Sequence, residues 1–298
     1  MPAQKLVGTG VALITPFNEA LEIDFTGLKR LLDSTAEKGV DYYVVMGTTG
    51  ESATLDKNEK KKILDFACAN NAKQLPIIYG IGGNNTKEII EQISDTDLTA
   101  VDAVLSVSPY YNKPSQEGIY EHYLKIADHS PVPIILYNVP GRTGSNISAE
   151  TTIRLSEHDN IIGTKEASGD ISQALTIIKH KADDFLLISG DDLLTISLHA
   201  IGAIGVISVL ANAFADIFNN IMEHLKTSDY QSATQEVLKL TEINPLMYEQ
   251  SNPVGIKQVL MEQGICENYV RLPLVPCTVA LKEKIQHCMT LFEGEKAL

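Results

Sequence analysis

A lysine at the end of an apolar run is the strongest candidate for chemistry in this chain of 298 residues. Residues 161–164 read Ile-Ile-Gly-Thr and continue into Lys165 and Glu166. Side chains alternate along a strand, so we expect these two charged residues to point to opposite faces. An amine inside an apolar interior is poorly solvated as an ammonium, and the neutral amine attacks carbonyl groups. Lys165 is therefore a candidate Schiff-base residue. A lysine that reaches solvent at the rim, or that pairs with an acid, is the alternative.

A tyrosine and a hydroxyl-rich turn also follow apolar runs. Tyr137 ends the run at 133–137 and could exchange protons with the amine, although a half-buried structural tyrosine fits as well. The segment Gly-Thr-Thr-Gly-Glu-Ser at 47–52 places two hydroxyls in a tight turn. The backbone N–H groups of such a turn can hold a carboxylate, and an ordinary connecting turn is the alternative.

Two further loops carry candidate binding residues. Arg142 lies in Val-Pro-Gly-Arg-Thr-Gly and is a candidate carboxylate clamp or a solvated loop arginine. Tyr110 and Tyr111 are adjacent on another loop, which is typical of an interface between chains.

Metal and nucleotide motifs are missing from the sequence. The seven histidines show no metal-ligand spacing, so no metal site is expected. Residues 80–85, Gly-Ile-Gly-Gly-Asn-Asn, lack the remaining residues of a dinucleotide or phosphate loop, and we interpret them as a plain turn. No cofactor is expected, which leaves the amine as the strongest catalytic group.

Composition narrows the class of protein. The formal net charge of −14 and the pI of about 4.9 argue against nucleic acid and anionic membranes as partners. The N-terminus does not read as a signal peptide, and the most apolar stretch, 201–215, is too short to span a bilayer. The four cysteines show no Cys-x-x-Cys pair, so we expect reduced thiols in a cytoplasmic protein.

Eight apolar, β-branched runs must position these residues. They fall at 10–15, 42–46, 76–80, 102–107, 133–137, 160–164, 184–189 and 205–209. Amphipathic patterns with N-cap residues lie between them, as at 24–38, 56–70 and 85–94. Eight such units predict a (β/α)8 barrel, with catalytic groups at the carboxyl ends of the strands; a doubly wound open sheet is the alternative. We expect the barrel at 1–225 and a helical extension at 226–298.

Several segments together resemble one enzyme family. They are GTTGESATL from residue 47, SPYYNKPSQEG from 108, LYNVPGRTG from 136, IIGTKEASGD from 161, LLISGDD from 186 and GVISV from 205. In this order and spacing, between LITPF and RLPLVP, the chain resembles the dihydrodipicolinate synthase family, within the N-acetylneuraminate lyase superfamily of class I aldolases. The resemblance implies a cofactor-free lyase that condenses pyruvate with L-aspartate 4-semialdehyde, the committed step toward diaminopimelate and L-lysine. It also implies a homotetramer built from two tight dimers.

The resemblance assigns the catalytic roles to four residues. Lys165 would form the Schiff base with pyruvate. Tyr137, Thr48 and Tyr111 would relay protons, with Tyr111 reaching in from a neighbouring subunit.

Four further residues would bind the substrates. Thr49 and the backbone around Gly190 and Ile207 would hold pyruvate or shape its site. Arg142 would hold the carboxylate of the second substrate.

One departure concerns regulation. Residues that match the lysine-binding allosteric pocket of inhibited family members are present, namely Ser52, Ala53, Asn84, Glu88 and Tyr110. The two histidines of that pocket fall at Lys57 and Lys60, whose cations would repel a lysine ammonium. Feedback inhibition by lysine is therefore not expected.

Other pyruvate aldolases of the superfamily are the nearest alternative. N-acetylneuraminate lyase and keto-deoxy sugar acid aldolases would use Lys165 and Tyr137 in the same way. The two threonines of the 47–52 turn, the Tyr110-Tyr111 pair and Arg142 favour the synthase. A metabolite-binding barrel without activity would not need this set of residues.

Overall fold

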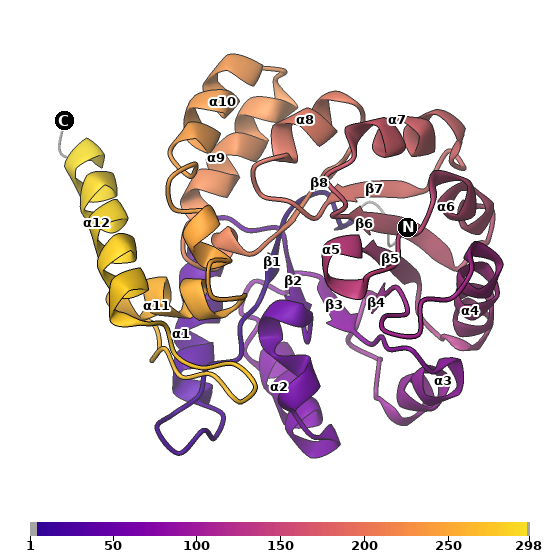
Figure 1. The fold of residues 1–298 in the computed structure, drawn as a ribbon, viewed down its shortest axis with the longest axis horizontal. Helices are drawn as coiled ribbons and strands as arrows, with labels where there is room; N and C mark the ends of the chain where they lie inside the picture. The colour runs from indigo at the N-terminus through magenta and orange to yellow at the C-terminus, as the bar shows by residue number, and fades with distance from the viewer. Residues whose placement is uncertain (1–4, 297–298) are drawn as a thin grey trace. The chain divides into compact units, whose positions relative to one another are not determined.

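Eight strands form the closed parallel barrel that the apolar runs predict (Figure 1). The computed structural model describes residues 5–296. The strands are β1 (Gly8–Ala12), β2 (Tyr42–Val45), β3 (Ile77–Gly80), β4 (Ala103–Val107), β5 (Ile134–Asn138), β6 (Ile161–Glu166), β7 (Leu186–Ser189) and β8 (Gly205–Ser208). They follow one another around the barrel in chain order. The predicted (β/α)8 class is therefore confirmed.

Helices connect the strands and continue after the last one. The α-helices are α1 (Phe25–Glu37), α2 (Lys57–Ala69), α3 (Thr86–Asp95), α4 (Gln116–His129), α5 (Pro140–Thr143), α6 (Ala149–Ser156), α7 (Ile171–His180), α8 (Thr195–Ala200), α9 (Ala215–Lys226), α10 (Tyr230–Leu238), α11 (Val254–Glu262) and α12 (Val279–Lys296). Short 3-10 turns are η2 (Thr48–Gly50), η3 (Ser52–Thr54), η4 (Leu210–Asn212) and η5 (Pro245–Met247).

The predicted helix starts are confirmed by their caps. The side chain of Asp24 accepts from the N–H of Gly27, and Asn85 accepts from Lys87. At α2, Asp56 and Glu59 form a reciprocal capping box. Each cap pairs an N–H group that has no partner inside its own helix, which stabilises the helix end by about 1 kcal/mol.

The first strand begins earlier than its apolar run indicated. The run starts at residue 10, whereas β1 begins at Gly8. Both of its glycines lie where a side chain would not fit: a Cβ on Gly8 would be 2.0 Å from the carboxylate of Asp41, and one on Gly10 would be 2.1 Å from the ring of Tyr42. These glycines belong to the strand because neighbouring strands approach closely there.

The chain divides into two compact units. The first comprises residues 1–10, 41–44 and 76–207, and the second comprises 11–40, 45–75 and 208–298. In the first unit neighbouring strands from β4 to β7 pair in parallel, with α4, α6 and α7 packed one against the next (Figure 1). In the second unit α9 packs on α10 and α11 packs on α12. These two units cover other residue ranges than the predicted barrel at 1–225 and extension at 226–298, so that domain boundary stays a prediction.

Two further features concern membrane-spanning helices and the state of the cysteines. Within residues 5–296, no helix combines the length and apolar character needed to cross a bilayer. All four cysteines lie in the same described part of the chain and are reduced thiols.

Candidate active site

The predicted nucleophile and its tyrosine lie side by side on neighbouring strands. Tyr137 on β5 and Lys165 on β6 are register partners. The side-chain nitrogen of Lys165 lies 4.4 Å from the centre of the Tyr137 ring. Both residues are buried, at 5% exposure for Lys165 and 8% for Tyr137. The structure thus brings together the two residues on which the predicted chemistry depends.

The next residue on each strand forms a polar pair behind them. The amide of Asn138 donates to the Glu166 carboxylate at 3.0 Å, and both side chains are buried. The same carboxylate accepts from the N–H of Ser168 at 2.7 Å and from the amide of Gln173 on α7 at 3.1 Å. Glu166 therefore faces the helix layer, as strand alternation predicted, and its hydrogen bonds fix the backbone next to Lys165.

Asn138 also fixes the loop that carries Arg142. Its side-chain oxygen accepts from the N–H of Ile147 at 3.0 Å, and its amide donates to Asn146 at 2.8 Å. Arg142 itself is exposed on α5, a single turn closed by Gly144 at φ 69°. The guanidinium thus stands on a loop whose base is tied to the residue after Tyr137.

Gly190 leaves room for the lysine. It follows β7, and its N–H donates to the carbonyl of Glu166 at 2.8 Å. A Cβ at this position would lie 3.1 Å from Cε of Lys165 and 2.7 Å from Cβ of Ala167. Ile207, the other predicted pyruvate residue, is buried on β8. A side chain at 190 would clash with Ala167, and Lys165 would have to shift by a few tenths of an ångström.

The aromatic loop after β4 is open to solvent. Tyr111 is 88% exposed and adopts φ 70°, and Tyr110 is 42% exposed. The carbonyl of Tyr110 accepts from the amide of Asn84 at 3.1 Å, which joins two residues of the predicted allosteric set. Glu88, a third member, lies in the first turn of α3.

The threonine turn, which we define as residues 47–51, belongs to the second unit. Thr48 and Thr49 begin the 3-10 turn η2, where the first N–H groups have no partner within the turn itself. Thr48 is exposed, whereas Thr49 is buried. The amide of Asn252 donates to the Thr49 hydroxyl at 3.0 Å. Ser52 and Ala53 follow directly in η3.

Three supporting residues were not among those predicted from the sequence. Asn138 and Gln173 bind Glu166, and Asn252 binds Thr49. The sequence did contain a signal for Asn138, because a polar residue follows the predicted catalytic residue on both strands. Asn252 gave no local signal, because its partner lies 203 residues away.

No metal centre is formed by the described residues. Across 5–296, no three histidine, cysteine, aspartate or glutamate side chains gather in a way that could hold a metal ion.

Known proteins match the chain over nearly its whole length. A family model described as the dihydrodipicolinate synthetase family matches residues 5–291. A 4-hydroxy-tetrahydrodipicolinate synthase from Cytophaga hutchinsonii is 53% identical over 290 residues, which cover 97% of this chain and 98% of the relative.

Solved structures agree with the sequence matches. The 4-hydroxy-tetrahydrodipicolinate synthase of Methylacidiphilum fumariolicum SolV superposes with a TM-score of 0.94 and 35% identity, covering 98% of both chains. The chloride-inhibited dihydrodipicolinate synthase of Acinetobacter baumannii, complexed with pyruvate, superposes with a TM-score of 0.92 and 36% identity, covering 96% of this chain and 98% of that one. The predicted resemblance is thereby confirmed: the chain is an enzyme that belongs to the dihydrodipicolinate synthetase family.

Proposed function

We propose that this enzyme condenses pyruvate with L-aspartate 4-semialdehyde through a Schiff base on Lys165, the 4-hydroxy-tetrahydrodipicolinate synthase reaction. The observation that carries the proposal is the buried amine of Lys165 over the ring of its register partner Tyr137. The relatives named above support the choice of reaction.

The chemistry begins at the lysine nitrogen. The neutral amine adds to C2 of pyruvate, and the carbonyl oxygen leaves as water to give an imine. Loss of a proton from C3 converts the imine into an enamine. C3 then attacks the aldehyde carbon of the second substrate, and the aldehyde oxygen takes up a proton. Attack of the substrate's amino group on C2 closes the ring and releases the lysine.

Each proton transfer needs a partner close to the amine. Tyr137 takes this role, with Thr48 and Tyr111 completing a relay. Tyr111 serves a neighbouring subunit, which its 88% exposure in a single chain supports.

Both substrates are anions, and the remaining residues bind them. The N–H groups of the threonine turn, with Thr49, hold the carboxylate of pyruvate, and the backbone at Gly190 and Ile207 shapes that site. Arg142 holds the carboxylate of the second substrate, for which its exposed guanidinium is available.

The assembly and its location belong to the same proposal. The enzyme is a cytoplasmic homotetramer of two tight dimers. Residues 1–225 form the catalytic barrel, and residues 226–298 form a helical extension of it. The enzyme uses no cofactor and no nucleic acid or membrane partner.

Trapping of the imine tests the mechanism. The enzyme is incubated with pyruvate, reduced with borohydride and digested, and the modified peptide is identified by mass spectrometry. We expect the label on Lys165 and none on the Lys165→Ala variant, while Lys179→Ala, at a neighbouring helix, keeps the label. A label on another lysine, or none on the wild type, would refute the Schiff-base assignment.

A second assay decides the substrate. Turnover of pyruvate with L-aspartate 4-semialdehyde is compared with cleavage of N-acetylneuraminate and of keto-deoxy sugar acids. Faster cleavage of a sugar acid would show that the enzyme is another pyruvate aldolase of the superfamily and not the synthase.

A further inference from the structure

We propose that Lys257, on helix α11, is a positioning residue for the threonine turn. This inference rests on the function proposed above. The turn carries Thr48 and Thr49, and Lys257 holds it through Glu51, the residue that ends the turn.

Glu51 adopts an unfavourable backbone conformation. Its φ of 53° and ψ of 35° lie in the left-handed region, which a Cβ disfavours and which glycine takes without cost. Its N–H closes η2 onto the carbonyl of Thr48 at 3.1 Å. A glutamate is used here because its side chain makes contacts that a glycine could not.

Those contacts lie in the interior. The side chain of Glu51 is 2% exposed and that of Lys257 is fully buried. Nζ of Lys257 donates to one carboxylate oxygen at 2.5 Å, and the N–H of Arg271 donates to the other at 3.0 Å. A buried charge without its partner is destabilising, so Lys257 and Glu51 each require the other.

Lys257 has two further partners that fix its position. It donates to the carbonyl of Tyr269 at 2.7 Å, and its nitrogen lies 4.2 Å from the centre of the Phe17 ring. Burial lowers the pKa of Lys257, and the Glu51 carboxylate opposes that shift.

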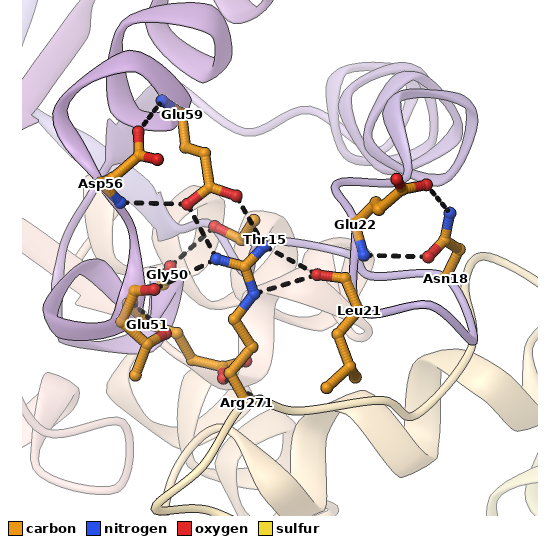
Figure 2. A network of polar contacts seen from close by, with 10 residues as sticks. Thr15, Asn18, Leu21, Glu22, Gly50, Glu51, Asp56, Glu59 and Arg271 are labelled. Carbon is orange, nitrogen blue, oxygen red and sulfur yellow. Dashed lines mark hydrogen bonds and ion pairs between the residues drawn. The ribbon is translucent and has the colours of Figure 1, made fainter.

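Arg271 is fixed in turn by the start of α2 (Figure 2). Its guanidinium makes two bonds to the Glu59 carboxylate, at 2.8 and 2.6 Å, and donates to the carbonyls of Leu21 and Thr54. Figure 2 shows Glu59 and Leu21 around the guanidinium of Arg271, beside Glu51 and the capping box at Asp56. The second oxygen of Glu51 is therefore held by a backbone group that cannot easily move.

The threonine turn is thus held at three successive residues. Asn252 donates to Thr49, and the hydroxyl of Thr15 donates to the carbonyl of Gly50 at 2.7 Å. Lys257 holds Glu51. Thr48 is the exposed residue that precedes these three, and its hydroxyl has the proposed proton-transfer role. The three contacts therefore fix the position of that hydroxyl. A displacement of about 1 Å can lower the rate of such a site about 100-fold.

The test compares the same substitution at two lysines of the C-terminal segment. Lys257→Met removes the buried partner of Glu51, and Lys284→Met removes the exposed partner of Glu249, which lies 2.9 Å away. For Lys257→Met we expect kcat/KM for pyruvate to fall by about 10- to 100-fold, with borohydride still placing the adduct on Lys165. Lys284→Met should match the wild type.

A double variant separates positioning from stability. In Glu51→Gln/Lys257→Met the unpaired buried charge is gone, so the melting temperature should recover relative to Lys257→Met. If Lys257 positions the turn, the kinetic defect persists in this variant, measured well below its melting temperature. The double variant also carries the test if Lys257→Met does not fold.

The results that would contradict this proposal differ from those that would contradict the proposed function. Wild-type kinetics in a folded Lys257→Met or in the double variant would show that Lys257 is only structural, and would leave the proposed function intact. A wild-type enzyme that forms no pyruvate adduct would overturn both proposals.

Discussion

Tyr137 and Lys165 are register partners on β5 and β6, and the residues that follow them, Asn138 and Glu166, are register partners and are joined by a hydrogen bond. The first pair supplies the amine and the phenol of the proposed chemistry. The second pair faces the helices and fixes the backbone one residue further along. Position along the strand therefore decides which residue reacts and which residue supports it.

Replacing Tyr137 by phenylalanine tests the proton relay. The ring over Lys165 is kept and the hydroxyl is lost, so we expect kcat to fall by about 100-fold or more. The pyruvate adduct should still form on Lys165, more slowly, as followed by borohydride trapping over time.

Tyr123→Phe is the matched control. Its buried hydroxyl donates to the carbonyl of Ser106 at 2.9 Å and also hydrogen-bonds the backbone of Tyr137, so it contacts main-chain groups beside the proposed site. This variant should lose about 1 kcal/mol of stability and keep its kcat. Equal kcat values for the two variants would remove Tyr137 from the relay.

Gly190→Ala tests the space beside the lysine. The new Cβ would lie 3.1 Å from Cε of Lys165, so the amine must shift. We expect the yield of pyruvate adduct to fall at least about 10-fold, because a misplaced nucleophile reacts slowly. Gly141→Ala, where a Cβ would meet nothing within 4 Å, should keep the wild-type yield.

Arg142→Ala tests binding of the second substrate. Loss of a charge-assisted hydrogen bond of about 1.5–3 kcal/mol should raise KM for L-aspartate 4-semialdehyde by about 10- to 100-fold. The yield of pyruvate adduct should not change. Arg154→Ala, which removes an exposed arginine paired with Glu117, is the control and should leave KM unchanged. Unchanged semialdehyde kinetics in Arg142→Ala would show that another group holds that carboxylate.

The stability of the fold should depend on pH through His122. Burial lowers the pKa of His122 to about 4, from an ordinary value of 6.5. As the pH falls from about 6.5 to about 4, the unfolded chain binds a proton that the folded protein does not, so stability declines and then levels off. The loss amounts to at most about 3 kcal/mol.

Unfolding in urea at several pH values measures this dependence. His122→Asn should flatten the decline between pH 6.5 and 4, and His180→Asn, at an exposed position, should leave it unchanged. An unaltered slope in His122→Asn would assign the decline to other groups.

L-Lysine should not inhibit the enzyme. By the resemblance, Lys57 and Lys60 are expected to stand where inhibited family members have histidines, and like charges disfavour binding of a lysine ammonium. Initial rates should stay constant up to millimolar lysine. A Lys57→His/Lys60→His variant shows whether these two residues cause the insensitivity. Inhibition of the wild type would contradict the expectation.

The barrel was predictable because its signal is local. Each buried parallel strand is a short apolar run, and each early helix begins with a capping residue. Lys165 and Tyr137 were predictable because each ends such a run. The apolar run alone ends at Thr164, whereas β6 continues to Glu166, as the expected alternation of Lys165 and Glu166 along one strand requires.

Long-range contacts were not predictable. Glu166 is satisfied by Asn138, 28 residues away, and Lys257 by Glu51, 206 residues away. A lysine inside an amphipathic helix is usually at the surface, and only the folded structure shows that this one is fully buried. The partners of the supporting residues are thus defined by the fold and not by sequence motifs.

The pairing of Asn138 with Glu166 sets a condition for protein engineering. A grafted lysine and tyrosine would have the reactive atoms without the groups that orient their strands. Transplanting the site into another barrel would require the dipeptides Tyr137-Asn138 and Lys165-Glu166 together, with Gln173 on the following helix. The smallest portable unit that keeps the lysine and tyrosine oriented is therefore five residues on two strands and one helix.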